Sequence, residues 1–254
     1  MGLRYYGFLG RHNRMKTTVI VPMRSGSKGI KNKNIKEFLG LPLYFWTVKK
    51  LYHLFKQGVV TKVIISSDSD WYLEKVKISF SLLFGENLIL SKRLPELSTD
   101  FATTEEVCLN IIYKYGIYDG ILGIVEVTSP LIPVDSLSLM FSSLNENIDS
   151  SFIVYEDIGQ FWKCKQPRYE WEKQYNNRKM RQEEDSPLYR EVGAWAIKVK
   201  KFMEEKNRIV HPVFPIVIPK ELGISINDLE EFEYAEILMK DNSSQIFKNC
   251  GLYE

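Results

Sequence analysis

The residues that could do chemistry gather in one basic loop near the start of the chain. Four cationic side chains lie within ten residues: Arg24, Lys28, Lys31 and Lys33. Small residues are interspersed among them: Ser25, Gly26, Ser27 and Gly29. Glycine permits backbone conformations in which several N–H groups point at one anion, while Arg and Lys add positive charge. The loop therefore predicts a phosphate site, and four cations favour a triphosphate over a single phosphate.

A strand must hold this loop in place. The preceding apolar, β-branched run at 19–21 is typical of a buried parallel strand. The loop matches neither the Walker A motif nor the dinucleotide pattern G-x-G-x-x-G. Nucleotide binding is one interpretation, and a solvated basic loop without a ligand is the other.

Polar side chains also follow the later predicted strands. Strands are expected at 62–67, 87–90, 120–125, 151–155, 193–197 and 213–218, and helices at 41–55, 69–79, 101–115, 136–144 and 228–240. This alternation predicts an α/β fold with a mostly parallel sheet covered on both faces. Asp68 and Glu126 each follow a strand, at the sheet edge where ligands bind in such folds. Asp68 could equally cap the next helix, and Asp100 is expected to be the N-cap of the helix at 101–115.

Composition excludes several classes of function. A net charge of +2 gives no general reason to expect nucleic acid or membrane binding, and no apolar run is long enough to cross a bilayer. The three cysteines, at 108, 164 and 250, are too far apart for a zinc site or a disulfide framework. We expect a cytoplasmic protein in which residues 1–14 are an N-terminal extension and residues 15–254 form a single domain.

The segment from 156 to 189 differs from the rest because its apolar periodicity lapses. Its aromatic residues lie among many charges: Phe161, Trp162, Tyr169, Trp171 and Tyr175. Exposed aromatic residues together with Arg are enriched at interfaces. The segment either packs on its own body or forms an oligomer contact.

Six sequence blocks, in order, resemble one family. The stretch P-M-R-S-G-S-K-G-I-K-N-K-N at 22–34 is similar to the signature loop of the cytidylyltransferases that activate sialic acid and related nonulosonic acids. The other blocks are I-I-S-S-D (64–68), R-L-P-E-L-S-T-D (93–100), E-V-T-S-P-L (126–131), R-Q (181–182) with R-E-V-G-A-W (190–195), and N-D-L-E-E-F-E-Y-A-E (227–236). Together they span nearly the whole chain.

The resemblance implies a Rossmann-like nucleotidyltransferase fold and transfer of CMP from CTP to a sugar acid, with release of pyrophosphate. It also implies Mg²⁺ as cofactor and a homodimer formed through an inserted arm at about 156–189. Catalytic roles fall to Arg24 and Lys33. The implied nucleotide-binding residues are Arg24, Ser25, Gly26, Ser27, Lys28, Gly29, Asn34, Arg93 and Glu126. The implied substrate-binding residues are Thr128, Ser129, Arg181, Gln182 and Arg190.

The chain departs from the family at its metal and sugar positions. The Asp pair that binds magnesium in the family corresponds to Ser225 and Asn227 here, so two neutral side chains replace two anionic ligands. Glu126 replaces a Gln, Ile132 an Arg and Val192 an Asn. Glu126 and Asp228 are the replacement metal ligands that we expect. The alternatives are a nucleotidyltransferase for another sugar or sugar phosphate, and a nucleotide-binding relative that has lost catalysis.

Overall fold

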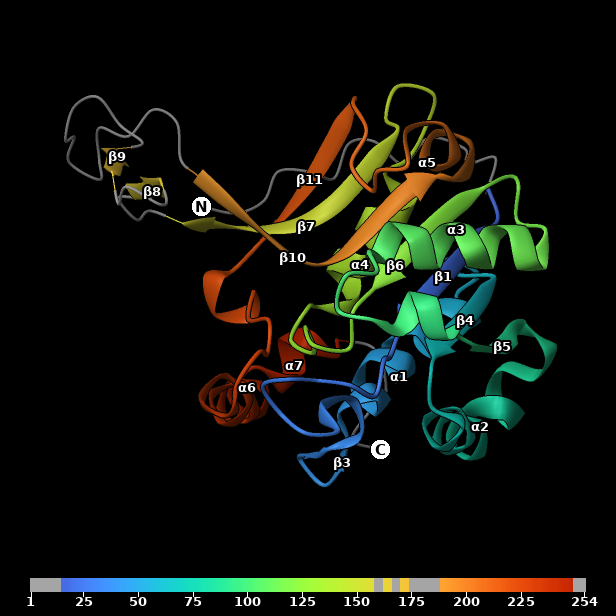
Figure 1. The fold of residues 1–254 in the computed structure, drawn as a ribbon, viewed down its shortest axis with the longest axis horizontal. Coiled ribbons are helices and arrows are strands. Elements are labelled where there is room, and N and C mark those ends of the chain that lie inside the picture. Colours follow the sequence, from blue (N-terminus) through green and yellow to red (C-terminus); the bar gives the residue numbers. More distant parts are fainter. Residues whose placement is uncertain (1–14, 158–161, 166–169, 174–187, 249–254) are drawn as a thin grey trace.

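A seven-stranded sheet forms the centre of the protein (Figure 1). The structure, a computed structural model, describes residues 15–157, 162–165, 170–173 and 188–248. The strand order is β11-β7-β10-β6-β1-β4-β5. In chain order the strands are β1 (Thr17–Pro22), β4 (Lys62–Ser67), β5 (Leu88–Lys92), β6 (Ile121–Val125), β7 (Ser150–Asp157), β10 (Leu188–Lys198) and β11 (Val213–Ile218). Within this sheet β10 runs antiparallel to both of its neighbours and the other strands are parallel, which confirms the predicted mostly parallel sheet.

Helices cover both faces because alternate strand residues point to opposite sides. Val19 and Val63 pack on one side against α1 (Leu43–Lys56), α2 (Asp70–Phe84), α4 (Val134–Ser142) and α6 (Leu229–Asp241). Ile20 and Ile64 pack on the other side against α3 (Thr104–Tyr115) and α5 (Val199–Glu205). Short elements in the described residues include β2 (Glu37–Phe38), β3 (Leu41–Pro42) and α7 (Ser243–Ile246). None of the helices in the described parts is long and apolar enough to cross a membrane.

One predicted helix start was wrong, and at a second helix the structure decides between two alternatives. Helix α3 does not begin after Asp100, because Thr103 is its N-cap: the Thr103 hydroxyl accepts from the Glu106 N–H at 3.2 Å, and a Glu106 carboxylate oxygen accepts from the Thr103 N–H at 2.8 Å. This reciprocal capping box satisfies two N–H groups that the helix leaves free. Helix α2 is capped by the side chain of Ser69 and not by Asp68. Both aspartates are thereby available for other contacts.

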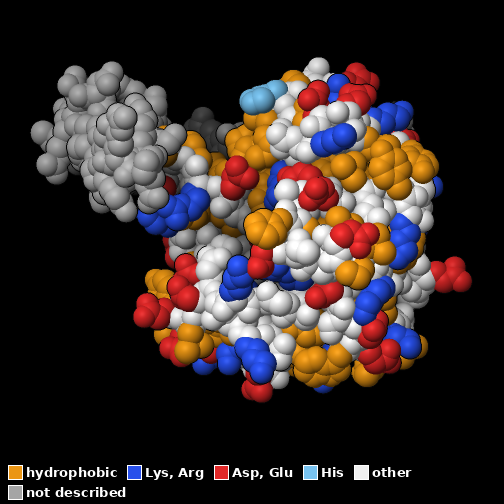
Figure 2. Space-filling model, in the orientation of Figure 1, with side chains coloured by type: hydrophobic (Ala, Val, Ile, Leu, Met, Phe, Trp, Pro, Cys, Tyr) orange, Lys and Arg blue, Asp and Glu red, His pale blue; other side chains and the backbone are white. Residues whose placement is uncertain are grey.

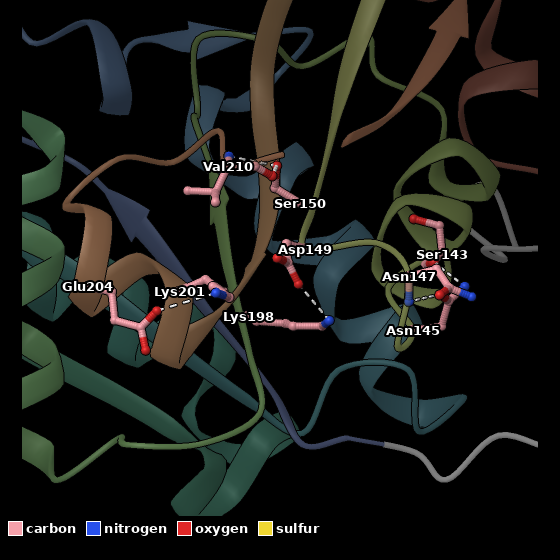
Figure 3. Close-up of polar contacts among 9 residues, drawn as sticks. All are labelled: Ser143, Asn145, Asn147, Asp149, Ser150, Lys198, Lys201, Glu204 and Val210. Atoms are coloured by element: carbon pink, nitrogen blue, oxygen red, sulfur yellow. Dashed lines mark hydrogen bonds and ion pairs between the residues drawn. The ribbon is translucent and has the colours of Figure 1, made fainter. Parts of the chain in front are cut away.

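A polar network joins the start of β7 to the end of β10 and to the loop that follows α5 (Figure 3). Lys198 at the end of β10 pairs with Asp149 just before β7, with 2.7 Å between Nζ and Oδ1. Ser150 exchanges two hydrogen bonds with the backbone of Val210, its hydroxyl donating to the carbonyl at 2.8 Å and accepting from the N–H at 3.0 Å. The network anchors the loop between α5 and β11, including Arg208.

The segment expected to form an arm is described only in part. Strands β8 (Trp162–Lys165) and β9 (Glu170–Lys173) pair antiparallel and lie beyond the end of the main sheet (Figure 1). Residues 158–161, 166–169 and 174–187 of that segment, and residues 1–14, lie outside the described residues, so both expectations stay predictions. Of the three cysteines, Cys108 is a buried thiol whose pKa is raised to about 12 by burial.

Candidate active site

The predicted polar loops converge on one pocket of about 550 Å³. It lies at the carboxyl ends of β1, β5 and β6, beside the first turn of α3. Figure 2 shows Lys and Arg side chains in the middle of this face, with Asp and Glu among them. Its lining includes these predicted residues: Arg24, Ser27, Lys28, Gly29, Lys33, Asn34, Arg93, Glu126 and Thr128. Its lining also includes Thr99, Asp100, Ala102, Thr103, Thr104 and Asn227.

Hydrogen bonds from the side chains of Asp68 and Asn34 fix the conformation of the basic loop. The carboxylate of Asp68 accepts from the Ser25 N–H at 2.7 Å and from the Ser25 hydroxyl at 2.8 Å. The side-chain amide of Asn34 donates to the carbonyl of Arg24 at 2.9 Å. Ser25 and Asp68 therefore shape the loop from behind, and the side chains of Arg24 and Lys28 are left to face the pocket.

The backbone conformations of Gly26 and Gly29 differ from the expectation. Neither Gly26 nor Gly29 has a left-handed φ, whereas Asn32 has a φ of 55°. A Cβ on Gly29 would lie 2.0 Å from the carbonyl oxygen of Asn227, far inside any permitted contact. A Cβ on Gly26 would meet nothing within 4 Å. Gly29 is thus needed for a close approach to the segment at 225–228, and the prediction of special φ values at these glycines was wrong.

Asp100 neutralises the two cations at the mouth of the loop. Its Oδ1 lies 2.8 Å from Nη1 of Arg24, and its Oδ2 lies 2.7 Å from Nζ of Lys28. Arg24 also donates to the carbonyl of Thr99 at 3.3 Å. Hydrogen bonds from Lys28 and Arg24 hold the pKa of Asp100 below its ordinary value.

Lys33 joins the basic loop to the late part of the chain. Its ammonium group donates to the carbonyl of Ile226 at 2.5 Å, and the N–H of Ile226 donates to the carbonyl of Thr128 at 2.8 Å. Burial lowers the pKa of Lys33, while the nearby carboxylate of Glu126 opposes that shift. A bound phosphate would favour the charged form further.

Glu126 lies at the end of β6 with its carboxylate against the pocket. Burial raises its pKa above the ordinary value, and Arg208, Thr128 and Lys33 oppose the shift. The hydroxyl of Thr128 donates to Oε2 of Glu126 at 3.3 Å. A Cβ on Gly193 would lie 2.9 Å from that same oxygen, so β10 confines the carboxylate from one side.

Arg208 is a residue that the sequence did not indicate. Its guanidinium makes a two-point ion pair with Glu105 in the first turn of α3, at 2.6 and 3.0 Å, and lies 4.5 Å from the ring centre of Trp195. Its charge is also the strongest opposing influence on Glu126. No sequence motif surrounds Arg208. Its role is visible only in the fold, where α3, β10 and the end of β6 bring Glu105, Trp195 and Glu126 around it.

Of the described residues predicted to bind nucleotide or substrate, these do not line the pocket: Ser25, Gly26, Ser129 and Arg190. Arg93 does line it, and its buried guanidinium donates to the hydroxyl and the carbonyl of Ser66 at 3.3 and 3.1 Å. Ser129 is buried and accepts from the Gly193 N–H at 3.3 Å. Arg190 is exposed and pairs with Asp157 at 3.5 Å. Arg181 and Gln182 lie outside the described residues.

The carboxylates of the two expected metal ligands, Glu126 and Asp228, both act on Lys33, where each opposes the lowering of the pKa by burial. Asp228 is the N-cap of α6, where its Oδ1 accepts from the Glu231 N–H at 2.8 Å. Within the described ranges no group of three or more His, Cys, Asp and Glu side chains could hold a metal ion. Magnesium in nucleotide sites is held by one or two carboxylates together with phosphate oxygens and water. Glu126 fits that limited role.

Comparison with known proteins identifies the family of the chain. The family model described as cytidylyltransferase matches residues 18–177. The chain is 27% identical to a pseudaminic acid cytidylyltransferase of Campylobacter jejuni, over 92% of this chain and 100% of that protein. It is 27% identical to an N-acylneuraminate cytidylyltransferase of Streptococcus agalactiae, over 86% of this chain and 52% of that protein.

Solved structures show the same fold. A CMP:2-keto-3-deoxy-manno-octonic acid synthetase complexed with CTP superimposes with a TM-score of 0.60 at 12% identity, covering 89% of this chain and 99% of that one. A 4-diphosphocytidyl-2C-methyl-D-erythritol synthase from Anaerococcus prevotii gives 0.63 at 10% identity with the same coverage. The sequence match covers more than half of the chain, and the chain therefore belongs to the cytidylyltransferase family of nucleotidyl-transferring enzymes.

Proposed function

We propose that the protein transfers CMP from CTP to a nonulosonic acid, a sialic-acid-like 2-keto sugar acid, and releases pyrophosphate. The observation that carries the proposal is the pocket in which Arg24, Lys28 and Lys33 converge with Glu126. The Campylobacter jejuni relative, which is matched over its full length, acts by its name on pseudaminic acid, and the Streptococcus agalactiae relative acts by its name on an N-acylneuraminate. These names support a sugar acid as acceptor.

In the proposed reaction the anomeric hydroxyl attacks the α-phosphorus of CTP. A new P–O bond to the sugar forms, the bond to the β-phosphate oxygen breaks, and pyrophosphate leaves with the electron pair. Such transfer depends on positioning and on neutralising charge more than on covalent chemistry. Arg24, Lys28 and Lys33 would bind the phosphates, and Asn34 would hold the loop that carries Arg24 in its present shape.

Glu126 has two uses in this proposal. Its raised pKa and its position at the pocket suit a group that accepts the proton of the attacking hydroxyl. It is also the carboxylate that would hold magnesium together with the phosphates, and the ion would supply further neutralisation of the triphosphate. Because Ser225 and Asn227 stand where the family has its magnesium-binding Asp pair, Glu126 would be the main carboxylate ligand of the ion.

We also infer a homodimer built through the segment at about 156–189. Its support is the position of β8 and β9, which continue from β7 and β10 beyond the end of the main sheet (Figure 1). Light scattering on the purified protein tests it, and a monomer at micromolar concentration would contradict it.

Release of pyrophosphate tests the activity. CTP, UTP, ATP and GTP are each incubated with pseudaminic acid, N-acetylneuraminic acid or a sugar 1-phosphate, with and without magnesium. We expect release only with CTP and a nonulosonic acid. Release with a sugar 1-phosphate would favour a nucleotidyltransferase of another specificity. CTP binding without any release would favour a relative that has lost its chemistry together with the Asp pair.

A further inference from the structure

The carboxylate of Asp100 lies between two cations of the basic loop that line the pocket, Arg24 and Lys28. One oxygen lies 2.8 Å from Arg24 and the other 2.7 Å from Lys28, so a single carboxylate bridges both cations. Two oxygens on two cations are also what a phosphate group presents to such a pair. The cations at this position are therefore not free before a ligand arrives.

The start of the neighbouring helix does not account for Asp100. Thr103 and Glu106 cap α3 by themselves, and Asp100 takes no part in that capping box. The side chain of Asp100 is 41% exposed, and Phe101 next to it is 94% exposed. A segment with so little buried surface can move at small cost when its ion pairs are replaced.

We propose that Asp100 is an internal competitor for the phosphate subsite formed by Arg24 and Lys28, and that it weakens the binding of the leaving phosphates and hastens release of pyrophosphate. This rests on the proposed function. CTP displaces the carboxylate because a triphosphate brings more charge to the two cations than Asp100 does. After the bond to the β-phosphate oxygen has broken, the carboxylate returns to Arg24 and Lys28 as pyrophosphate leaves.

Competition with Asp100 should affect only ligands that carry a β- or γ-phosphate. Pyrophosphate and CTP have the phosphates that compete with Asp100. CMP lacks the β- and γ-phosphates, so its binding does not depend on displacing the carboxylate. This difference separates competition at one subsite from a general effect of negative charge near the pocket.

The test is calorimetric titration of Asp100→Asn with inorganic pyrophosphate, CTP and CMP. Loss of one unit charge a few ångströms from the ligand predicts about tenfold tighter binding of pyrophosphate and CTP, with CMP unchanged within about twofold. Asp100→Ser, which also removes the bridging oxygens, should tighten binding to a similar extent. The matched control is Asp70→Asn, because Asp70 makes an exposed 2.7 Å ion pair with Lys92 and does not line the pocket.

The outcomes separate this inference from the function on which it rests. If neither the unmodified protein nor the variants bind CTP, both the function and the inference fall. If CTP binds but the Asp100 variants hold pyrophosphate equally or more weakly, the inference alone falls. Equal tightening for CMP, or for Asp70→Asn, would also overturn it, because the effect would then not belong to this subsite.

Discussion

Replacing Gly29 by Ala tests how the basic loop is positioned. The added Cβ would lie 2.0 Å from the carbonyl oxygen of Asn227 and 3.2 Å from its carbonyl carbon. Carbon and oxygen do not approach much closer than about 3 Å, so one backbone segment must move by about 1 Å. The segment at 225–228 is held by Lys33 and by the carbonyl of Thr128, so we expect the loop to move instead.

The cost of such overpacking is about 1–3 kcal/mol. For a chain of this size each kcal/mol lowers the melting temperature by about 2–4 °C. Because the shifted loop carries Arg24 and Lys28, we expect CTP affinity to fall at least tenfold. Thermal melting and calorimetric titration measure the two effects.

The matched control is Gly26→Ala, in the same loop. A Cβ there meets nothing within 4 Å and its φ is not left-handed, so we expect CTP affinity within about twofold of the unmodified protein. Equal losses in the two variants would refute the reasoning, since loop flexibility, and not the close approach to Asn227, would then explain the glycines.

Two further predictions concern the surroundings of Glu126. Burial raises the pKa of Glu126 in the folded state, so the folded protein becomes less stable relative to the unfolded chain as pH rises above about 4.5 and this buried group loses its proton. Glu126→Gln should therefore raise the melting temperature more at pH 8 than at pH 4.5. The exposed control Glu86→Gln should change the melting temperature little at either pH. Arg208→Lys should lower stability by about 1–2 kcal/mol, because Lys can neither pair with Glu105 at two points nor lie flat on Trp195, and an unchanged midpoint in urea would contradict this.

The sequence predicted the sheet because its signals are local. The buried runs that became β1, β4 and β6 are short, apolar and β-branched, and polar residues begin within three positions of the end of each run. Hydrophobic periodicity reports such elements directly. The pocket could be placed for the same reason, since parallel strands bring their carboxyl ends to one edge.

Contacts between distant parts of the chain could not be predicted in this way. The sequence placed Asp68 and Asp100 near helix starts, where capping was the prediction for Asp100 and one of two alternatives for Asp68. Their observed partners lie in the basic loop, 43 residues from Asp68 in one case, and only the packed sheet brings them together. Arg208 illustrates the same limit, since its partner Glu105 lies 103 residues away.

The contact between Lys33 and Ile226 spans 193 residues and has a consequence for the order of assembly. All seven strands of the main sheet are complete at Ile218, before the segment that closes over the basic loop. A growing chain can thus form its scaffold while the pocket still lacks one wall. In the order of synthesis the pocket wall at 225–228 therefore follows all seven strands, and it comes together with the part of the core that α6 supplies through Phe232 and Met239.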